Sequence, residues 1–281
     1  MKTIGVIGAG TMGSGIAQVA AEAGYKVIMR DIEEQFVQRG LAALEKNLAR
    51  AVDKGKKSRE EADALRNRVS GTTGLEDLGA ADFIIEAIIE NMGLKKELYA
   101  NLDEICKEEA ILASNTSGLS ITEMASATGR PQNIVGMHFF NPVPVMKLVE
   151  VIRGFDTSDE TFEQTMELAR KMGKEPIAVN EAPLFAVNRI LVPMINEAAF
   201  VLMEGVATAE DIDRGMMLGA NHPIGPLALA DLVGLDVLLA VMETLYHETG
   251  DSKYRPCPLM RKLVRAGHYG RKTGRGFYTY G

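Results

Sequence analysis

The feature that most constrains this chain is the glycine pattern near its start. A short β-branched run from Thr3 to Ile7 leads directly into Gly8-x-Gly10-x-x-Gly13, and apolar residues then recur at helical spacing. This pattern predicts a strand, a tight turn and a helix. Gly8 would permit the turn, Gly10 would let the backbone approach a ligand, and Gly13 would let the helix pack on its strand.

The residues after this helix indicate the ligand. Tyr25 to Arg30 has the pattern of a second strand, and Asp31 stands at its end. An acidic residue about 20 positions past such glycines hydrogen-bonds an adenosine ribose, while the pyrophosphate lies at the helix N-terminus. Because Asp31 would repel a 2′-phosphate, NAD is favoured over NADP, although Arg30 beside it weakens that preference. The predicted cofactor site comprises Gly8, Gly10, Thr11, Met12, Gly13 and Asp31.

Charge and cysteine content narrow the class of protein. The net charge of -7 over 281 residues argues against binding to nucleic acid or to a membrane surface, since both require a basic surplus. Cys106 and Cys257 show no metal-ligand spacing, so we expect no metal site and a reducing compartment. With neither a signal peptide nor a membrane-spanning run in the sequence, we expect a cytoplasmic protein.

The order of elements predicts an α/β fold in two domains. Strand and helix patterns alternate up to the strand at Glu175–Val179, apart from a polar helical stretch between Ile32 and Arg68. After Pro183 the remaining pattern is helical. We therefore expect a Rossmann-type, mostly parallel sheet with a helical hairpin insertion in residues 1–183, followed by an all-helical domain in residues 184–281.

Several polar residues occupy places where ligands of a parallel sheet bind, at the carboxyl ends of strands. Glu90 and Lys95 follow the buried run 81–87, and the loop Asn115–Ser120 follows another strand. Helix capping is the alternative for each, and Ser120-x-x-Glu123 resembles a capping box. In the hairpin, Arg50, Lys54 and Lys57 form a positive island, which is either a solvated turn or a landing site for substrate phosphates.

One histidine is placed for acid/base chemistry. His138 ends a strand, in the crevice where a nicotinamide would lie, and could exchange a proton with a hydroxyl that loses hydride. A satisfied core histidine is the alternative. Glu150 on the adjoining apolar strand needs a polar partner, and pairing with His138 would orient the imidazole and favour its cation.

Taken together, these residues resemble a known family, the short-chain 3-hydroxyacyl-CoA dehydrogenases, and most of all its bacterial 3-hydroxybutyryl-CoA members. The similar stretches are Gly8-Ala9-Gly10-Thr11-Met12-Gly13, Ser114-Asn115-Thr116-Ser117, the block from His138 to Glu150, and Asn188-Arg189-Ile190. The similarity extends through Gly219–Pro226 to the tail Gly270–Tyr278, so it covers nearly the whole chain.

The resemblance implies an activity and a set of roles. The family interconverts (S)-3-hydroxyacyl-CoA and 3-oxoacyl-CoA with NAD(H), in fatty-acid and butyrate metabolism, and short acyl chains are expected here. It implies that His138 is the acid/base with Glu150 as its partner, and that Ser117 and Asn188 hydrogen-bond the substrate and the histidine. Also implied are a cofactor site that includes Glu90, Lys95, Asn115 and Ser117, coenzyme A phosphates near Arg50, Lys54 and Lys57, and a homodimer formed by the C-terminal domain.

Two positions depart from the family pattern. Leu184 replaces a glycine that usually precedes the active-site asparagine, which would alter the hinge between domains or narrow the acyl pocket, and is unfavourable if that backbone needs φ > 0. His268 replaces an aromatic residue in the tail. Two alternatives stay open: a dehydrogenase of the same fold that acts on a free hydroxy or sugar acid, and a dinucleotide-binding protein without turnover.

Overall fold

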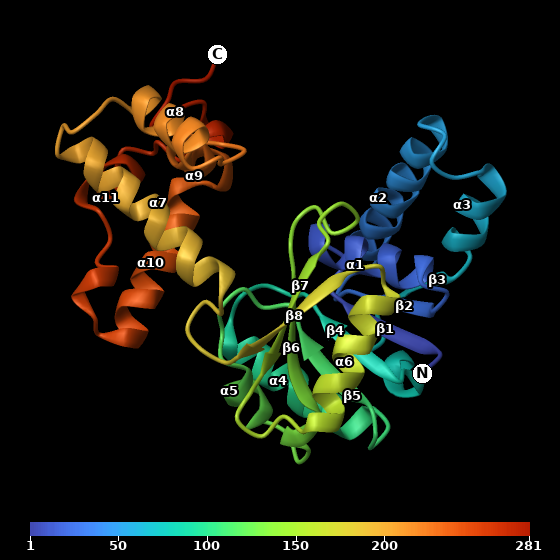
Figure 1. Cartoon of the computed structure of the whole chain (residues 1–281). Coiled ribbons are helices and arrows are strands. Elements are labelled where there is room, and N and C mark those ends of the chain that lie inside the picture. The colour runs from blue at the N-terminus through green and yellow to red at the C-terminus, as the bar shows by residue number, and fades with distance from the viewer. The chain divides into compact units, whose positions relative to one another are not determined.

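An eight-stranded sheet forms the centre of the first of two structural units, as the computed structural model of residues 1–281 shows (Figure 1). Its strands are β1 (Thr3–Ile7), β2 (Lys26–Arg30), β3 (Val69–Thr72), β4 (Phe83–Glu86), β5 (Ile111–Ser114), β6 (Ile134–Phe139), β7 (Leu148–Arg153) and β8 (Glu175–Asn180). They lie in the order β3-β2-β1-β4-β5-β6-β7-β8. All neighbours are parallel except β6 and β7, which confirms the mostly parallel sheet.

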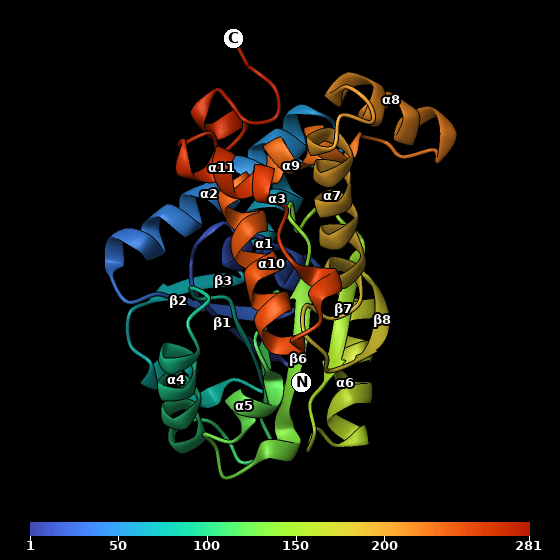
Figure 2. The same ribbon diagram turned by 90° about the vertical axis from the view of Figure 1, so that its left-hand side faces the viewer.

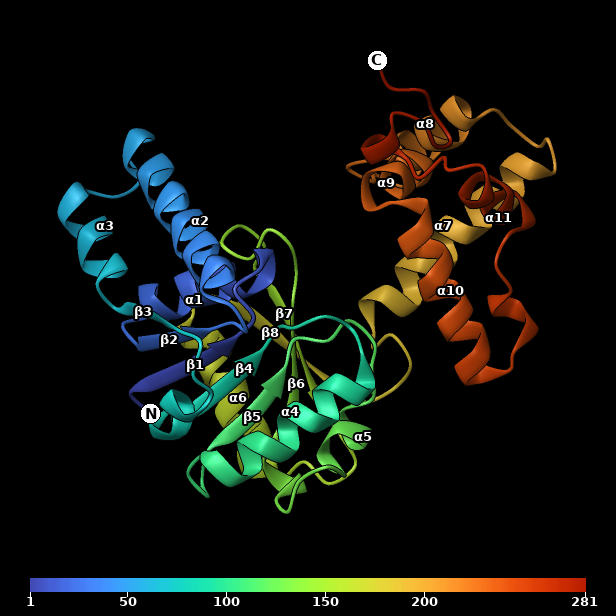
Figure 3. The same ribbon diagram turned by 180° about the vertical axis from the view of Figure 1, so that it is seen from behind.

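Helices cover both faces of this sheet (Figures 2 and 3). They are α1 (Thr11–Glu22), α2 (Glu34–Asp53), α3 (Arg59–Arg66), α4 (Met92–Ile105), α5 (Ile121–Ala125) and α6 (Asp159–Lys171). Apolar residues of α1, α2 and α6 share one hydrophobic core, whereas those of α4 and α5 belong to another. The first unit is thus a three-layer α/β/α arrangement.

Alternation along the strands decides which side chains meet which helices. In β4, Phe83 and Ile85 point into the core with α1, and Ile84 points into the core with α4. Glu86 has the parity of Ile84, and it is fully buried. The last residue of β4 is therefore directed toward the α4 side of the sheet, where the site described below is found.

The helical insertion is less symmetric than the sequence pattern indicates. Its first arm, α2, has 20 residues, whereas its second arm, α3, has only 8. Ser58 begins α3 with a capping box to Glu61. The second arm is short because the chain must return to β3, which starts at Val69 and pairs with β2.

The second unit, residues 186–281, is helical, as expected. It contains α7 (Val187–Met203), α8 (Ala209–Gly219), α9 (Pro226–Val233), α10 (Leu235–Thr249) and α11 (Pro258–Arg265). Buried Asp231 accepts hydrogen bonds from the backbone N–H groups of Phe277 and Tyr278 and so fastens the C-terminal tail. None of the helices has the length and apolarity needed to cross a membrane.

Candidate active site

The glycine loop has the tight geometry that the sequence predicts. Gly8 has φ = 98°, and a Cβ atom there would lie 2.5 Å from the carbonyl oxygen of Ala87. A Cβ on Gly13 would lie 1.7 Å from the carbonyl oxygen of Gly8, so only glycine lets α1 approach β1 this closely. The space beside Gly10 is open within 4 Å. Two glycines are therefore required by packing, and the third faces free space at the start of α1.

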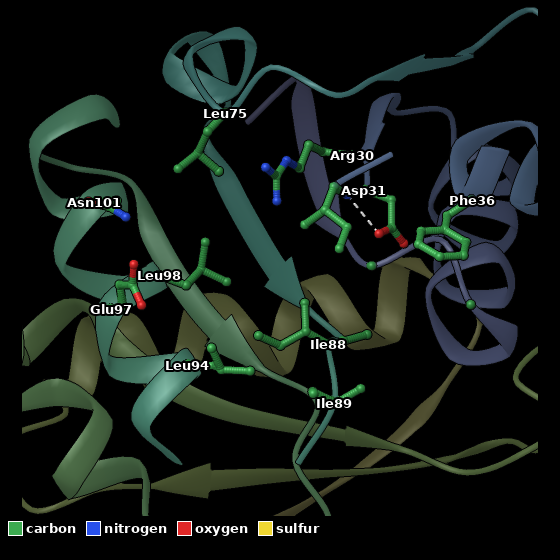
Figure 4. A pocket seen from close by; sticks show the side chains of 14 residues that line it. Arg30, Asp31, Phe36, Leu75, Ile88, Ile89, Leu94, Glu97, Leu98 and Asn101 are labelled. Atoms are coloured by element: carbon green, nitrogen blue, oxygen red, sulfur yellow. Dashed lines mark hydrogen bonds between the residues drawn. The ribbon is translucent and has the colours of Figure 1, made fainter. Parts of the chain in front are cut away.

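Asp31 connects this loop to the end of β2. Its Oδ2 atom accepts a hydrogen bond of 2.7 Å from the N–H of Ala9, and its Oδ1 accepts one of the same length from the N–H of Ile32. Arg30 beside it donates from Nε to the carbonyl oxygen of Thr73 at 3.1 Å. The carboxylate lies at the edge of a pocket that the Arg30 side chain also lines (Figure 4).

The pocket next to Asp31 has the size and chemistry of a nucleotide site. Its volume is about 560 Å³, and it extends from Gly8 and Gly10 to the first turns of α4. Its walls are mainly apolar, with Ile32 and Ile89 exposed by 66% and 68%, while Glu97 and Asn101 supply polar groups at one side (Figure 4). Apolar walls suit a flat base, and the glycine loop with free helix N–H groups suits a pyrophosphate. The residues present therefore fit a dinucleotide.

His138 and Glu150 are brought together by strand register. The two residues are direct partners in the antiparallel pair of β6 and β7, so their side chains lie on the same face. His138 Nδ1 is 2.8 Å from Glu150 Oε2, and the two side chains are 6% and 0% exposed. The bond favours a proton on Nδ1 and leaves Nε2 to meet a ligand. The rings of Phe140 and Phe185 pack on the imidazole, with centroids 4.6 and 6.0 Å away.

Glu90 holds the loop that carries Ser117. Its Oε1 atom accepts from the backbone N–H of Ser117 at 2.6 Å and from the Thr116 hydroxyl at 3.1 Å. Lys95 is fully buried, with its Nζ atom 2.6 Å from Glu86 and 3.5 Å from Glu90. The ammonium of Lys95 thus supports Glu90 from inside the protein, while the side chain of Ser117 is exposed.

Asn115 is also held by its neighbours. Its side-chain oxygen accepts from the backbone N–H of Phe139 at 2.8 Å, and its own N–H donates to the carbonyl oxygen of Glu86 at 2.7 Å. This residue therefore joins the carboxyl ends of β4, β5 and β6. No group of three or more His, Cys, Asp or Glu side chains is arranged to hold a metal ion.

Comparison with known proteins identifies the family. Residues 3–182 match the description "3-hydroxyacyl-CoA dehydrogenase, NAD binding domain", and residues 185–280 match "3-hydroxyacyl-CoA dehydrogenase, C-terminal domain". The chain belongs to the 3-hydroxyacyl-CoA dehydrogenase family. The pocket beside Asp31 accordingly lies in an NAD-binding domain, and the NAD cofactor expected from the sequence is confirmed.

Individual members of the family are similar over their full length. The chain is 57% identical over 280 residues to the probable 3-hydroxybutyryl-CoA dehydrogenase of Bacillus subtilis (strain 168), covering 100% of this chain and 98% of that protein. It is 54% identical to the 3-hydroxybutyryl-CoA dehydrogenase of Clostridioides difficile, with 99% of each covered. The crystal structure of (S)-3-hydroxybutyryl-CoA dehydrogenase from Ralstonia eutropha superposes with a TM-score of 0.98 at 53% identity, covering 100% of this chain and 99% of that one.

Four other expected site residues belong to α7 and to the helical insertion. Asn188 is the second residue of α7 in the second unit, and its role stays a prediction. Arg50 and Lys54 are exposed at the end of α2, and Lys57 pairs with Glu22 of α1 at 3.4 Å. Of these three cations only Lys57 is partly neutralised by an ion pair, and the role of all three also stays a prediction.

Sequence reasoning missed several residues that shape this site. Ile32 and Ile89 line the pocket, and each is an apolar residue directly beside an acidic residue at the end of a strand. An apolar residue beside an acid at such a position could have indicated a wall of the nucleotide pocket. Glu86 was missed because it reads as the end of a buried strand, and its partner Lys95 comes from a helix packed on that strand.

Proposed function

We propose that this protein interconverts (S)-3-hydroxyacyl-CoA and 3-oxoacyl-CoA with NAD(H), acting on short chains such as 3-hydroxybutyryl-CoA and acetoacetyl-CoA. The observation that carries the proposal is the buried His138–Glu150 pair at 2.8 Å, in the same unit as the NAD pocket. The named dehydrogenases that are similar over the full chain support the substrate class.

In this mechanism His138 moves one proton at its Nε2 atom. During oxidation the neutral imidazole accepts the proton of the substrate 3-hydroxyl group, and Glu150 stabilises the imidazolium that forms. In the reverse direction the imidazolium returns that proton to the developing alkoxide. NAD bound beside Asp31 supplies the hydride acceptor when the substrate is oxidised.

Ser117 and Asn188 would orient the reacting oxygen. The hydroxyl of Ser117 lies on the exposed side of a loop whose backbone Glu90 holds, so it is free to donate to a substrate oxygen. By family resemblance, Asn188 would hydrogen-bond the substrate or the histidine. Arg50, Lys54 and Lys57 would meet the phosphates of coenzyme A, since they form a positive group in an acidic chain.

We further propose a homodimer formed through the second unit, in the cytoplasm. Large apolar side chains of this unit are exposed, among them Ile190, Val206, Leu218 and Leu232. Exposed apolar residues in such number favour burial against a second copy. Light scattering coupled to gel filtration should give twice the mass of the chain, and a monomer at micromolar concentration would contradict this proposal.

The decisive experiment measures NADH oxidation by the purified protein with acetoacetyl-CoA, free acetoacetate and no substrate, and repeats each assay with NADPH. Rapid turnover with the thioester and NADH is the expected result. Turnover with the free acid alone would favour the hydroxy-acid alternative. NADH binding without turnover on any 3-oxoacyl-CoA would favour a protein that binds the dinucleotide and has lost catalysis.

A further inference from the structure

The turn between β8 and α7 contains two successive residues, Leu184 and Phe185, in a conformation that glycine normally adopts. The N–H of Phe185 donates to the carbonyl oxygen of Ala182 at 2.9 Å, which closes a four-residue turn with Pro183 in second place. Leu184 occupies the third place with φ = 61°, in the left-handed region. Turns with proline second and positive φ third ordinarily carry glycine there. A leucine at this place is unfavourable for the backbone, so its side chain must provide a compensating contact.

That contact is with Gly118. Leu184 is only 3% exposed, and its Cδ2 atom lies 2.7 Å from the point where a Cβ of Gly118 would stand. The next two atoms near that point, at 3.6 and 3.7 Å, are the Cα and N of Leu184 itself. Gly118 does not have a positive φ, so a side chain there would be opposed by the Cδ2 methyl group of Leu184 and not by the backbone conformation. The side chain of Leu184 fills the space that a side chain at residue 118 would need.

This contact acts on the loop that carries Ser117. On its polar side the loop is held by Glu90, which accepts from Ser117, and by the Thr116 hydroxyl, which accepts from the N–H of Leu119 at 2.9 Å. Leu184 supplies the apolar support at Gly118. The loop is thus held from two directions, by hydrogen bonds and by one leucine side chain.

The same turn also reaches the histidine. Phe185, next to Leu184, is 2% exposed and places its ring centroid 6.0 Å from that of His138. Two successive residues of one turn therefore pack against Gly118, the neighbour of Ser117, and against the His138 ring. A displacement of this turn would move the Ser117 loop and the His138 ring together.

We propose that Leu184 is a positioning residue that fixes the Ser117 loop relative to His138 through its contact with Gly118. The proposal rests on the proposed function, because the geometry matters for turnover only if Ser117 and His138 act on one substrate. Leu184 does not line the pocket beside Asp31, so its substitution should change turnover and leave NADH affinity unaltered.

A double-mutant cycle between residues 118 and 184 tests this. Gly118→Ala should lower kcat with acetoacetyl-CoA, because the new methyl group meets Leu184 and displaces the loop. Leu184→Ala should lower kcat less. The double variant should be about three- to tenfold faster than Gly118→Ala alone, since the methyl group then enters the vacated space. Gly215→Ala is the matched control, as nothing lies within 4 Å of that position in α8.

Three further measurements separate positioning from simple loss of stability. The dissociation constant of NADH should be unchanged in every variant, and thermal unfolding should show that all of them are folded. Leu184→Met should keep most of the wild-type kcat, in contrast to Leu184→Ala. If the losses of kcat in the two single variants simply multiply in the double variant, the two residues do not act together. That result would overturn the proposal and leave the proposed function intact. If Gly118→Ala does not fold, equal kcat for Leu184→Ala and Leu184→Met overturns it. A wild-type protein without turnover on 3-oxoacyl-CoA overturns both.

Discussion

The two ends of strand β4 carry carboxylates with different tasks. At the amino end, Asp82 accepts from the backbone N–H groups of Lys2 and Thr3 and pairs with Lys107 at 2.6 Å, in a partly exposed setting. At the carboxyl end, Glu86 is fully buried and pairs with Lys95, also at 2.6 Å. The two ion pairs have the same length. The Asp82 pair ties the start of β1 to the start of β4, whereas Lys95 of the Glu86 pair also supports Glu90 and the Ser117 loop.

The contacts at the two ends of β4 explain why the polar groups of the site lie at one edge of the parallel sheet. At the amino edge Asp82 binds the backbone of Lys2 and Thr3 and the side chain of Lys107, none of which belongs to the proposed site. At the carboxyl edge each polar side chain accepts from the backbone of another segment: Asp31 from the glycine loop, Glu90 from the Ser117 loop, and Asn115 from the end of β6. Ion pairs at the first edge should therefore affect stability alone, and those at the second should affect both stability and turnover.

Lys95→Met should have the largest effect. It removes the cation from fully buried Glu86, and an uncompensated buried charge lowers the free energy of unfolding by about 3–5 kcal/mol. Lys107→Met at the opposite edge is the control, with an expected loss of about 1 kcal/mol or less because its pair is partly exposed. Urea unfolding measures both. Equal losses would show that burial does not distinguish the two edges.

Glu150→Gln should come next, with kcat lowered about 100-fold because His138 loses the carboxylate that orients it and stabilises its cation. NADH affinity should stay nearly intact, because the pair is separate from the Asp31 pocket. Steady-state kinetics and NADH fluorescence measure the two quantities. Glu175→Gln, in an exposed pair on neighbouring β8, serves as the control. Unchanged turnover in Glu150→Gln would contradict the pairing.

Asp31→Ser should weaken NADH binding about tenfold, since a charged hydrogen-bond acceptor is lost from the loop and the ribose site. The preference for NADH over NADPH should fall as well, because the repulsion of a 2′-phosphate disappears. Titration of both cofactors measures this. Asp53→Ser, at the end of α2, is the control. A preserved preference would mean that Asp31 does not select the cofactor.

Asp82 gives a pH-dependent prediction for the amino edge. Partial burial opposes its ionisation, but Lys107 and the N–H groups of Lys2 and Thr3 outweigh this and lower its pKa from 3.8 to about 2. Because the folded pKa is depressed, the contribution to stability is complete above pH 4 and is lost as the pH falls through 2. Asp82→Asn should lower stability at pH 7 by about 1 kcal/mol without changing kcat. Altered turnover would contradict a structural role.

The smallest effect is expected for the exposed cations of the insertion. Arg50→Ala and Lys54→Ala should each raise the KM for acetoacetyl-CoA by about threefold, as exposed ion pairs contribute less than about 1 kcal/mol. Lys171→Ala, an exposed cation on α6, is the control. If the KM values do not change, the group is a solvated turn.

Much of the fold could be predicted because its signals are local. Continuous apolar runs identified buried strands such as β4 and β6, and the glycine pattern identified the first turn. The short length of α3 and the presence of α11 could not be predicted in the same way. Both depend on tertiary packing: α11 packs on neighbouring α10 and on α7, which lies far from it in sequence.

The chemical groups of the site and their places at strand ends could be predicted from the amino-acid sequence alone. Glycine spacing, the acid after the second strand, and the His138 and Glu150 side chains follow from residue type and a period of two along each strand. Only the tertiary structure decided which groups touch: Lys95 with Glu86, Glu90 with Ser117, and Leu184 with Gly118. The physical reason is that backbone geometry fixes direction over a few residues, whereas contacts across long sequence separations arise from how the helices and loops pack onto the sheet.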